Sequence, residues 1–108
     1  MKKPLFFVLS CLPVSGLAIF PFIIVKHRDL KNNQRLVYHE RIHFAQQKEL
    51  LFVFFFALYL LNYLGNLLRF RNHEKAYREI CFEREAYEND TLRHYLRNRK
   101  LFAFLNYL

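Results

Sequence analysis

Residues 37–68 read VYHERIHFAQQKELLFVFFFALYLLNYLGNLL, a polar stretch that runs directly into an apolar one. No Gly or Pro interrupts the chain between residues 22 and 64, and so few turn-forming residues favour long helices over short strands. We therefore predict a helix that begins near Val37 and leads into an apolar helical block over residues 50–68. A helix that is apolar on all sides is buried, either in protein or in lipid.

The segment that precedes this stretch is also apolar. Residues 4–25 carry no charged side chain and are long enough to span a bilayer, but Pro13, Gly16 and Pro21 interrupt them. Three interpretations stay open: an N-terminal membrane anchor, a buried helix followed by a short strand near residues 18–25, and a cleaved signal peptide.

The charge of the chain indicates its class of partner. Lys and Arg number 17 against 9 Asp and Glu, and 54% of the residues are hydrophobic. The basic residues flank apolar blocks, and no Gly-rich or zinc-finger spacing accompanies them, so we expect contact with membrane lipid and no nucleic acid. Cys11 and Cys81 form no CxxC pair and are expected to be buried thiols.

Residues 39–43 form an HExxH pattern, His39-Glu40-Arg41-Ile42-His43. Side chains four residues apart lie on the same face of a helix, so both imidazoles can reach one Zn²⁺ ion. Glu40 lies about 100° around the helix from His39, where it can accept a proton from a water molecule beside the metal. Two histidines on a surface helix are the simpler interpretation, but the buried block that follows and Gln46 on the same face favour a metal site.

A catalytic zinc site needs a third protein ligand from another element. The strongest candidates are Glu83 and Glu85, in a second polar helix expected over residues 74–88. Glu83 shares a helix face with Ala76 and Ala86, whose small side chains permit a neighbouring helix to approach closely. Glu85 lies on the opposite, mixed face. We therefore expect Glu83 to be the ligand, with Glu85 as the alternative; the simpler interpretation of both is a solvated, salt-bridging face.

Two segments, HERIHFAQQKELL at residues 39–51 and AYREICFEREAYEND at residues 76–90, resemble a group of small bacterial membrane-linked proteins. They also look like a reduced version of the gluzincin metallopeptidases, among them the integral-membrane heat-shock and CAAX-prenyl proteases. Those enzymes carry HExxH on one helix and a Glu on a second, in an ExxA(D) context. The resemblance implies His39 and His43 as zinc ligands, Glu40 as general base and Glu83 as third ligand.

The chain departs from that family pattern after Ala86. Tyr87 stands where those proteases carry an Asp that orients a ligand histidine. The candidates to replace that Asp are Glu79, Gln46 and Asp90. The candidates to stabilise an oxyanion are His73, Tyr77, Tyr87 and His94. The chain is also too short for the substrate-binding sheet and lobe of a full protease.

The metal hypothesis limits the topology. If residues 4–25 and 50–68 both crossed a bilayer, the histidines and Glu83 would lie on opposite sides, so at most one block spans. We expect residues 50–68 to form a buried or re-entrant helix. The fold predicted is mainly α: a small helical bundle in which the HExxH helix packs on the Glu-bearing helix. Residues 1–30 form the anchor or buried segment, and residues 31–108 a single zincin-like domain whose last helix ends near residue 105.

The sequence suggests three functional interpretations. The first is a membrane-associated, zinc-dependent metallopeptidase at the bacterial inner membrane, acting on a peptide or protein substrate. The second is a non-catalytic membrane protein with a structural or vestigial metal site that acts in assembly or interaction. The third, a helical di-iron protein, needs a second ExxH pattern that the chain does not contain.

Overall fold

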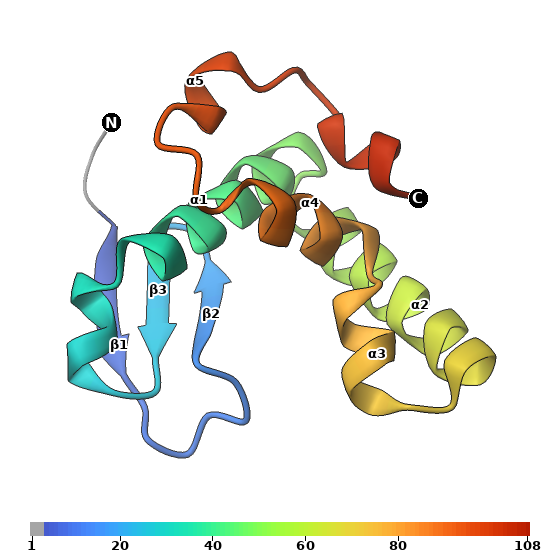
Figure 1. The fold of residues 1–108 in the computed structure, drawn as a ribbon, viewed down its shortest axis with the longest axis horizontal. Coiled ribbons are helices and arrows are strands. Elements are labelled where there is room, and N and C mark those ends of the chain that lie inside the picture. Colours follow the sequence, from blue (N-terminus) through green and yellow to red (C-terminus); the bar gives the residue numbers. More distant parts are fainter. Residues whose placement is uncertain (1–3) are drawn as a thin grey trace.

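The computed structural model describes residues 4–108 and is mainly α, with a small three-stranded sheet at the N-terminal end (Figure 1). The strands are β1 (Leu5–Val8), β2 (Gly16–Ile19) and β3 (Phe22–Val25). The helices that follow are η1 (Arg28–Asn32), α1 (Gln34–Glu49), α2 (Val53–Phe70), α3 (His73–Arg78), α4 (Cys81–Asn89), α5 (Tyr95–Asn98) and η2 (Ala103–Tyr107).

The sheet occupies the segment for which the sequence left an anchor, a buried helix or a signal peptide open. Its strand order is β1-β3-β2, with β3 parallel to β1 and antiparallel to β2. A turn at the cis Phe20-Pro21 bond joins β2 to β3, so the short strand expected near residues 18–25 is two paired strands. Residues 4–25 thus hold three strands and no helix, because the β-branched and aromatic residues on either side of Pro13 and Gly16 pair with one another.

Helix α1 packs across the sheet (Figure 1). It begins three residues before the expected Val37 because the side chain of Asn33 accepts a hydrogen bond from the backbone N–H of Leu36 and caps it. Phe44 of α1 lies in a buried cluster with Ala18, Ile23 and Val25 of the sheet. The helix that carries the HExxH pattern is therefore anchored on the sheet.

The chain breaks between α1 and α2, where the sequence contains neither Gly nor Pro. Leu51 and Phe52 adopt positive φ angles of 54° and 62°. The N–H of Phe52 donates to the carbonyl of Gln47 at 2.8 Å, and that of Leu51 to Lys48 at 3.4 Å. These two bonds form the hydrogen-bond pattern of a Schellman helix end, with a leucine at the position that glycine usually takes. The expected continuation of one helix into the other is therefore wrong.

The polar helix expected over residues 74–88 is also two helices, because Ile80 is extended between α3 and α4. The side chain of Asn62 on α2 accepts the N–H of Cys81 at 2.8 Å and so caps the start of α4. A second buried cluster joins α2, α4 and η2. Its buried members are Phe55, Ile80, Cys81, Phe82 and Phe104.

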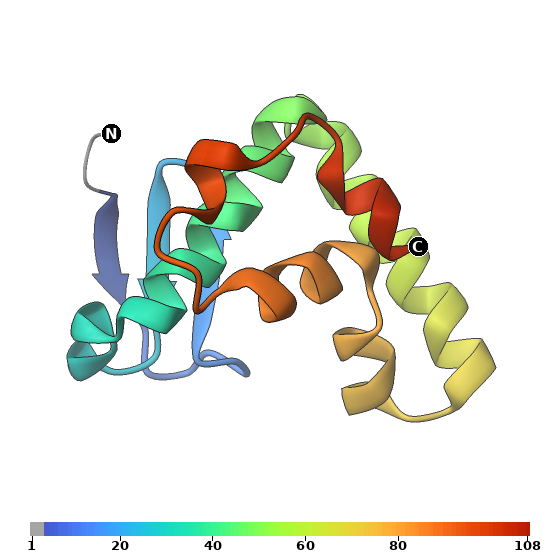
Figure 2. The same ribbon diagram turned by 45° about the horizontal axis from the view of Figure 1, so that its top comes forward.

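The C-terminal segment does not form the expected single helix. It makes the short α5, which lies over α1, and η2, which crosses α2 in this view (Figure 2) and also contacts α4. Arg99 between them reaches back to Glu49 and Glu85, and this ion pair fixes the segment's path. Of the two cysteines, Cys81 is buried as expected, whereas Cys11 is exposed.

Candidate metal centre

The structure brings together the three residues that the sequence proposes as metal ligands. His39 and His43 lie one turn apart on α1, with ring centroids 4.9 Å apart. Glu83 on α4 points its Oε1 atom at both, 2.8 Å from His39 Nε2 and 3.1 Å from His43 Nε2. All three side chains are at most 11% exposed. Two nitrogens and one carboxylate oxygen thus converge at one buried point.

The outer nitrogen of each imidazole is also held. His39 Nδ1 lies 3.1 Å from Asp90 Oδ2, and His43 Nδ1 lies 2.7 Å from Gln46 Oε1. The amide orientation of Gln46 follows from its Nε2 group, which donates to the Phe82 carbonyl at 3.1 Å and to the Glu85 carboxylate at 3.0 Å. Asp90 and Gln46, two of the three candidates for the orienting role, therefore hold the rings.

These outer contacts fix the tautomer of both histidines. A carboxylate and an amide oxygen can only accept, so each Nδ1 carries a hydrogen. In the neutral rings, both Nε2 lone pairs then face the Glu83 carboxylate. Outer partners of this kind orient and strengthen histidine ligands in metal sites.

Glu83 has an outer partner of its own. Tyr59, in the first half of α2, donates its hydroxyl to Oε2 of Glu83 at 2.5 Å and leaves Oε1 directed at the histidines. Tyr59 is not among the site residues expected from the sequence. A signal was present, because Tyr59, Asn62, Tyr63 and Asn66 recur at helical spacing through an otherwise apolar stretch.

The electrostatics of the centre call for a positive charge. Burial alone would raise the pKa of Glu83, but the facing histidines lower it well below its ordinary value. Burial alone would lower the pKa of His43, but the Glu83 carboxylate raises it to about 9. The Nε2 atoms of the two histidines and the Oε1 atom of Glu83 all present lone pairs to one another. Unless a cation lies between them, a proton must. A divalent ion at the same place would meet two imidazoles and a carboxylate, the donor set of catalytic zinc.

Glu40 lies beside this point, as the helical register predicts. One ligand atom from each of His39, Glu40 and His43 lies within 4.8 Å of the others. Burial raises the pKa of Glu40 above its ordinary value, which makes its carboxylate a stronger base. Gly16 of β2 faces it closely: a Cβ atom at that position would lie 3.4 Å from Oε2 of Glu40.

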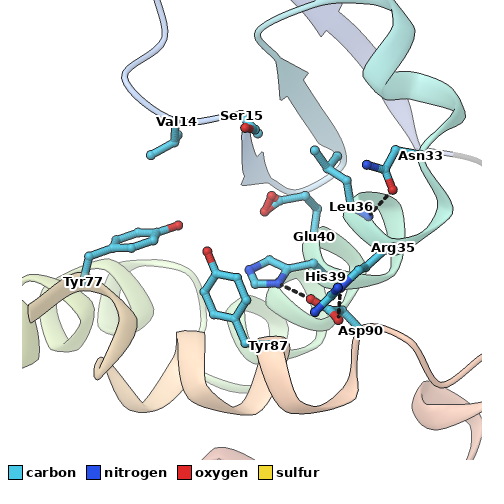
Figure 3. Close-up of a pocket in the computed structure, with 11 residues that line it drawn as sticks. Val14, Ser15, Asn33, Arg35, Leu36, His39, Glu40, Tyr77, Tyr87 and Asp90 are labelled. Carbon is cyan, nitrogen blue, oxygen red and sulfur yellow. Dashed lines mark hydrogen bonds and ion pairs between the residues drawn. The ribbon is translucent and has the colours of Figure 1, made fainter. Parts of the chain in front are cut away.

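Glu40 opens onto a cleft of about 300 Å³ (Figure 3). The residues before β2 form one wall, and Tyr77 and Tyr87 form the other, with both hydroxyls turned toward the space in front of Glu40. Burial raises the pKa of both phenols, so they stay protonated and can donate hydrogen bonds. A second, more apolar cavity of about 280 Å³ adjoins Glu40, His43 and Glu83 and extends to Phe56 on α2.

The remaining candidates from the sequence lie elsewhere. Glu85, the alternative ligand, accepts hydrogen bonds from Arg99, Tyr95 and Gln46 and touches neither histidine. Glu79 lies 3.8 Å from Arg84. Two histidines were also candidates to stabilise an oxyanion. His73 forms a hydrogen bond with Tyr63, and His94 lines a separate cavity.

Comparison of the chain with protein-family models, with curated proteins and with solved structures gave no match.

Proposed function

We propose that this chain is a zinc-dependent hydrolase of peptide bonds that works at a membrane. The observation that carries the proposal is the pair of imidazoles whose Nδ1 atoms are fixed from behind, so that both Nε2 atoms converge on the Oε1 atom of Glu83. A purely structural ion pair needs no such outer support on every member, whereas a metal centre does.

His39, His43 and Glu83 would hold the ion, and three protein ligands leave a fourth position open, as in catalytic zinc sites. When bound, zinc supplies Lewis acidity, which acidifies water and polarises a carbonyl group. The chain's own residues supply the rest.

Glu40 is the general base in this proposal. Its buried carboxylate lies within 4.8 Å of both histidines at the floor of the cleft, and it takes a proton from water there. Tyr77 and Tyr87 lie on the wall opposite β2 and share a hydrogen bond in which Tyr87 accepts. The proton of Tyr87 is then available to donate to the negative oxygen that develops as the carbonyl carbon becomes tetrahedral.

Strand β2 supports a peptide as the substrate. It is an edge strand, and the carbonyl of Ser15, just before it, accepts from Lys26 on the β3 side. Backbone groups alternate in direction along a strand, so those of Gly16 face outward from the sheet. Further along this edge, Gln47 already bonds the backbone of Ala18 and Phe20. Gly16 lines the same cleft as Glu40, and an extended peptide could pair with its outward backbone groups and so lie in front of the carboxylate.

The test is hydrolysis of a quenched-fluorescent library of extended peptides by the zinc-loaded full chain. We expect cleavage by the wild type, and Glu40→Gln should retain zinc but lose activity by at least about a hundredfold, as for removal of a general base. The matched control is Glu88→Gln, an exposed carboxylate on α4. Retained activity in Glu40→Gln would refute its role. Zinc binding without cleavage of any peptide would instead favour the non-catalytic alternative.

A further inference from the structure

The apolar helix α2 has two unlike faces. Its inner face carries the side chains that bind the rest of the protein: Phe55, Tyr59, Asn62, Tyr63 and Asn66. Its outer face is apolar along its whole length. The exposed members are Val53, Phe54, Phe56, Leu58, Leu60, Leu61, Leu64 and Leu68. Only Phe55 is buried in the entire helix.

A face of this kind is more than a monomeric soluble protein usually exposes. Among the described residues, α2 is the one helix long and apolar enough to cross a membrane, with a mean hydropathy of 1.4. Length and composition alone do not separate a helix that crosses a bilayer from one that lies on it.

The packing of α3 against α2 distinguishes a helix that crosses the bilayer from one that lies on its surface. Helix α3 runs beside the C-terminal half of α2 (Figure 2), where Asn66 donates to the carbonyl of Ala76 at 3.2 Å. Its outer side chains, including Glu74, Lys75 and Arg78, are exposed. Helix α4 starts further in, where the N–H of Cys81 bonds to Asn62. If α2 crossed the bilayer, the charged side chains of α3 and α4 would have to enter the headgroup and hydrocarbon regions, which is unfavourable for each ionised group. A helix lying in the interface keeps them in water.

The ends of α2 match an anionic lipid surface. Lys48 lies exposed before its start, and Arg69 and Arg71 lie exposed at its end. Lys75 lies over the ring of Phe70, 4.7 Å from its centroid, at the same end. Basic residues next to an inserted apolar face bind acidic headgroups.

We propose that α2 lies in the plane of an anionic membrane surface, with its outer face inserted into one leaflet, and does not cross the bilayer. The apolar cavity beside the metal centre then opens next to the lipid, because Phe56, one of its walls, is 42% exposed on α2 and Leu17, another wall, is 38% exposed on β2. Resting on the proposed function, this placement gives the substrate class: an extended apolar peptide segment held at the membrane surface.

The first test is flotation of the full chain with vesicles of phosphatidylcholine alone or with added phosphatidylglycerol. We expect flotation that is stronger on the anionic vesicles and falls with salt. The double variant Leu61→Asp/Leu64→Asp should lose flotation by at least tenfold. Leu92→Asp, at an exposed position between α4 and α5, is the matched control. Arg69→Gln/Arg71→Gln keeps the apolar face and should weaken binding to anionic vesicles by roughly fivefold per arginine.

Flotation that is unchanged in both double variants, or a dimer in lipid-free solution that does not float, would overturn the proposal.

The second test separates an in-plane helix from a spanning one. In a Cys11→Ser/Cys81→Ala background, Leu51→Cys and Glu74→Cys place single thiols at the two ends of α2, both at exposed positions. With protein added to sealed vesicles, a membrane-impermeant maleimide outside should label both. Protection of one end until detergent is added would show a spanning helix and overturn the proposal.

The two proposals fail separately. Glu40→Gln leaves α2 untouched and should float like the wild type even if no peptide is ever cleaved. Leu61→Asp/Leu64→Asp lies outside the metal centre and should bind zinc like the wild type while it remains in solution. Loss of both properties in one of these variants would indicate misfolding, which circular dichroism detects, and Arg69→Gln/Arg71→Gln then decides the membrane proposal.

Discussion

Glu83 and Glu85 lie two residues apart on α4, both buried, and they have opposite surroundings. Glu85 faces a resident cation: Arg99 donates to it and also to Glu49, and Tyr95 adds a further hydrogen bond. Glu83 faces two imidazoles and a phenol, none of which carries a permanent charge. Burial raises the pKa of a carboxyl group, and it is Arg99 that holds the pKa of Glu85 below its ordinary value.

The difference separates a carboxylate whose charge Arg99 balances from one that has no permanently charged partner among the contacts given above. Buried charges are stable only when paired, so Glu85 belongs to a closed structural network. Glu83 has a charge that only a proton or a bound cation can balance. Gln46 connects the two regions, since it binds His43 through Oε1 and Glu85 through Nε2. The Glu85 network therefore fixes the orientation of Gln46, which in turn holds the His43 ring toward Glu83.

The largest expected effect is on the free energy of unfolding, when the cation that pairs with Glu85 is removed. Arg99→Leu leaves the Glu85 and Glu49 carboxylates buried without a cation and should lower the free energy of unfolding by about 3–5 kcal/mol. Urea denaturation of the metal-free protein measures it. Arg97→Leu, an exposed arginine on α5, is the control and should change little. A small effect of Arg99→Leu would mean that Glu85 is not held as described.

A smaller effect is expected from zinc itself. Zinc at a hundred times its Kd should raise the free energy of unfolding of the wild type by about 2.7 kcal/mol, and a chelator should remove the gain. His43→Ala should abolish this response, whereas His94→Ala, which lines a separate cavity, should keep it. Equal responses in the two variants would place the zinc elsewhere.

Two neighbouring glutamines test the connection between the regions. Gln46→Leu removes the outer partner of His43 and should weaken zinc binding by about 10–100-fold. Gln47 is equally buried but binds the backbone of Ala18 and Phe20 in the sheet. Gln47→Leu should therefore cost stability, about 1–3 kcal/mol for each backbone group left unsatisfied, without changing zinc affinity. Competition with a fluorescent zinc chelator distinguishes them, and equal affinities would refute the role of Gln46.

The smallest effect is expected at Asp90. An asparagine there can still accept the Nδ1–H of His39, but it loses its charge, so Asp90→Asn should weaken zinc binding by only about tenfold. Arg35→Ala is the control, because the side chain of Arg35 is 63% exposed although it pairs with Asp90. A larger loss in Arg35→Ala than in Asp90→Asn would contradict this order.

The sequence predicts the parts that depend on local spacing. The HExxH turn lies on a helix, and the helical register of residues 83–87 separates Glu83 from Glu85, even though the helix is shorter than expected. Gln46 and Asp90, which orient the histidines, are among the residues that the sequence offers for that role. Gln46 lies one turn beyond His43 on the same helix, and Asp90 directly follows α4.

The remainder depends on contacts that spacing does not encode. The Schellman end at Leu51 uses a leucine where glycine is the usual signal, so the break before α2 is invisible in the sequence. The parallel pairing of β1 with β3 joins segments separated by all of β2. Arg99 reaches Glu49 across fifty residues, and no local pattern marks that pair.

Zinc retention by the two α4 carboxylate variants tests the central claim most directly. Purified wild type, Glu83→Gln and Glu85→Gln would be loaded with zinc, dialysed against a weak chelator and analysed by mass spectrometry for metal. We expect the wild type and Glu85→Gln to retain zinc and Glu83→Gln to lose it. Zinc retained equally by all three proteins, or lost only in Glu85→Gln, would contradict it.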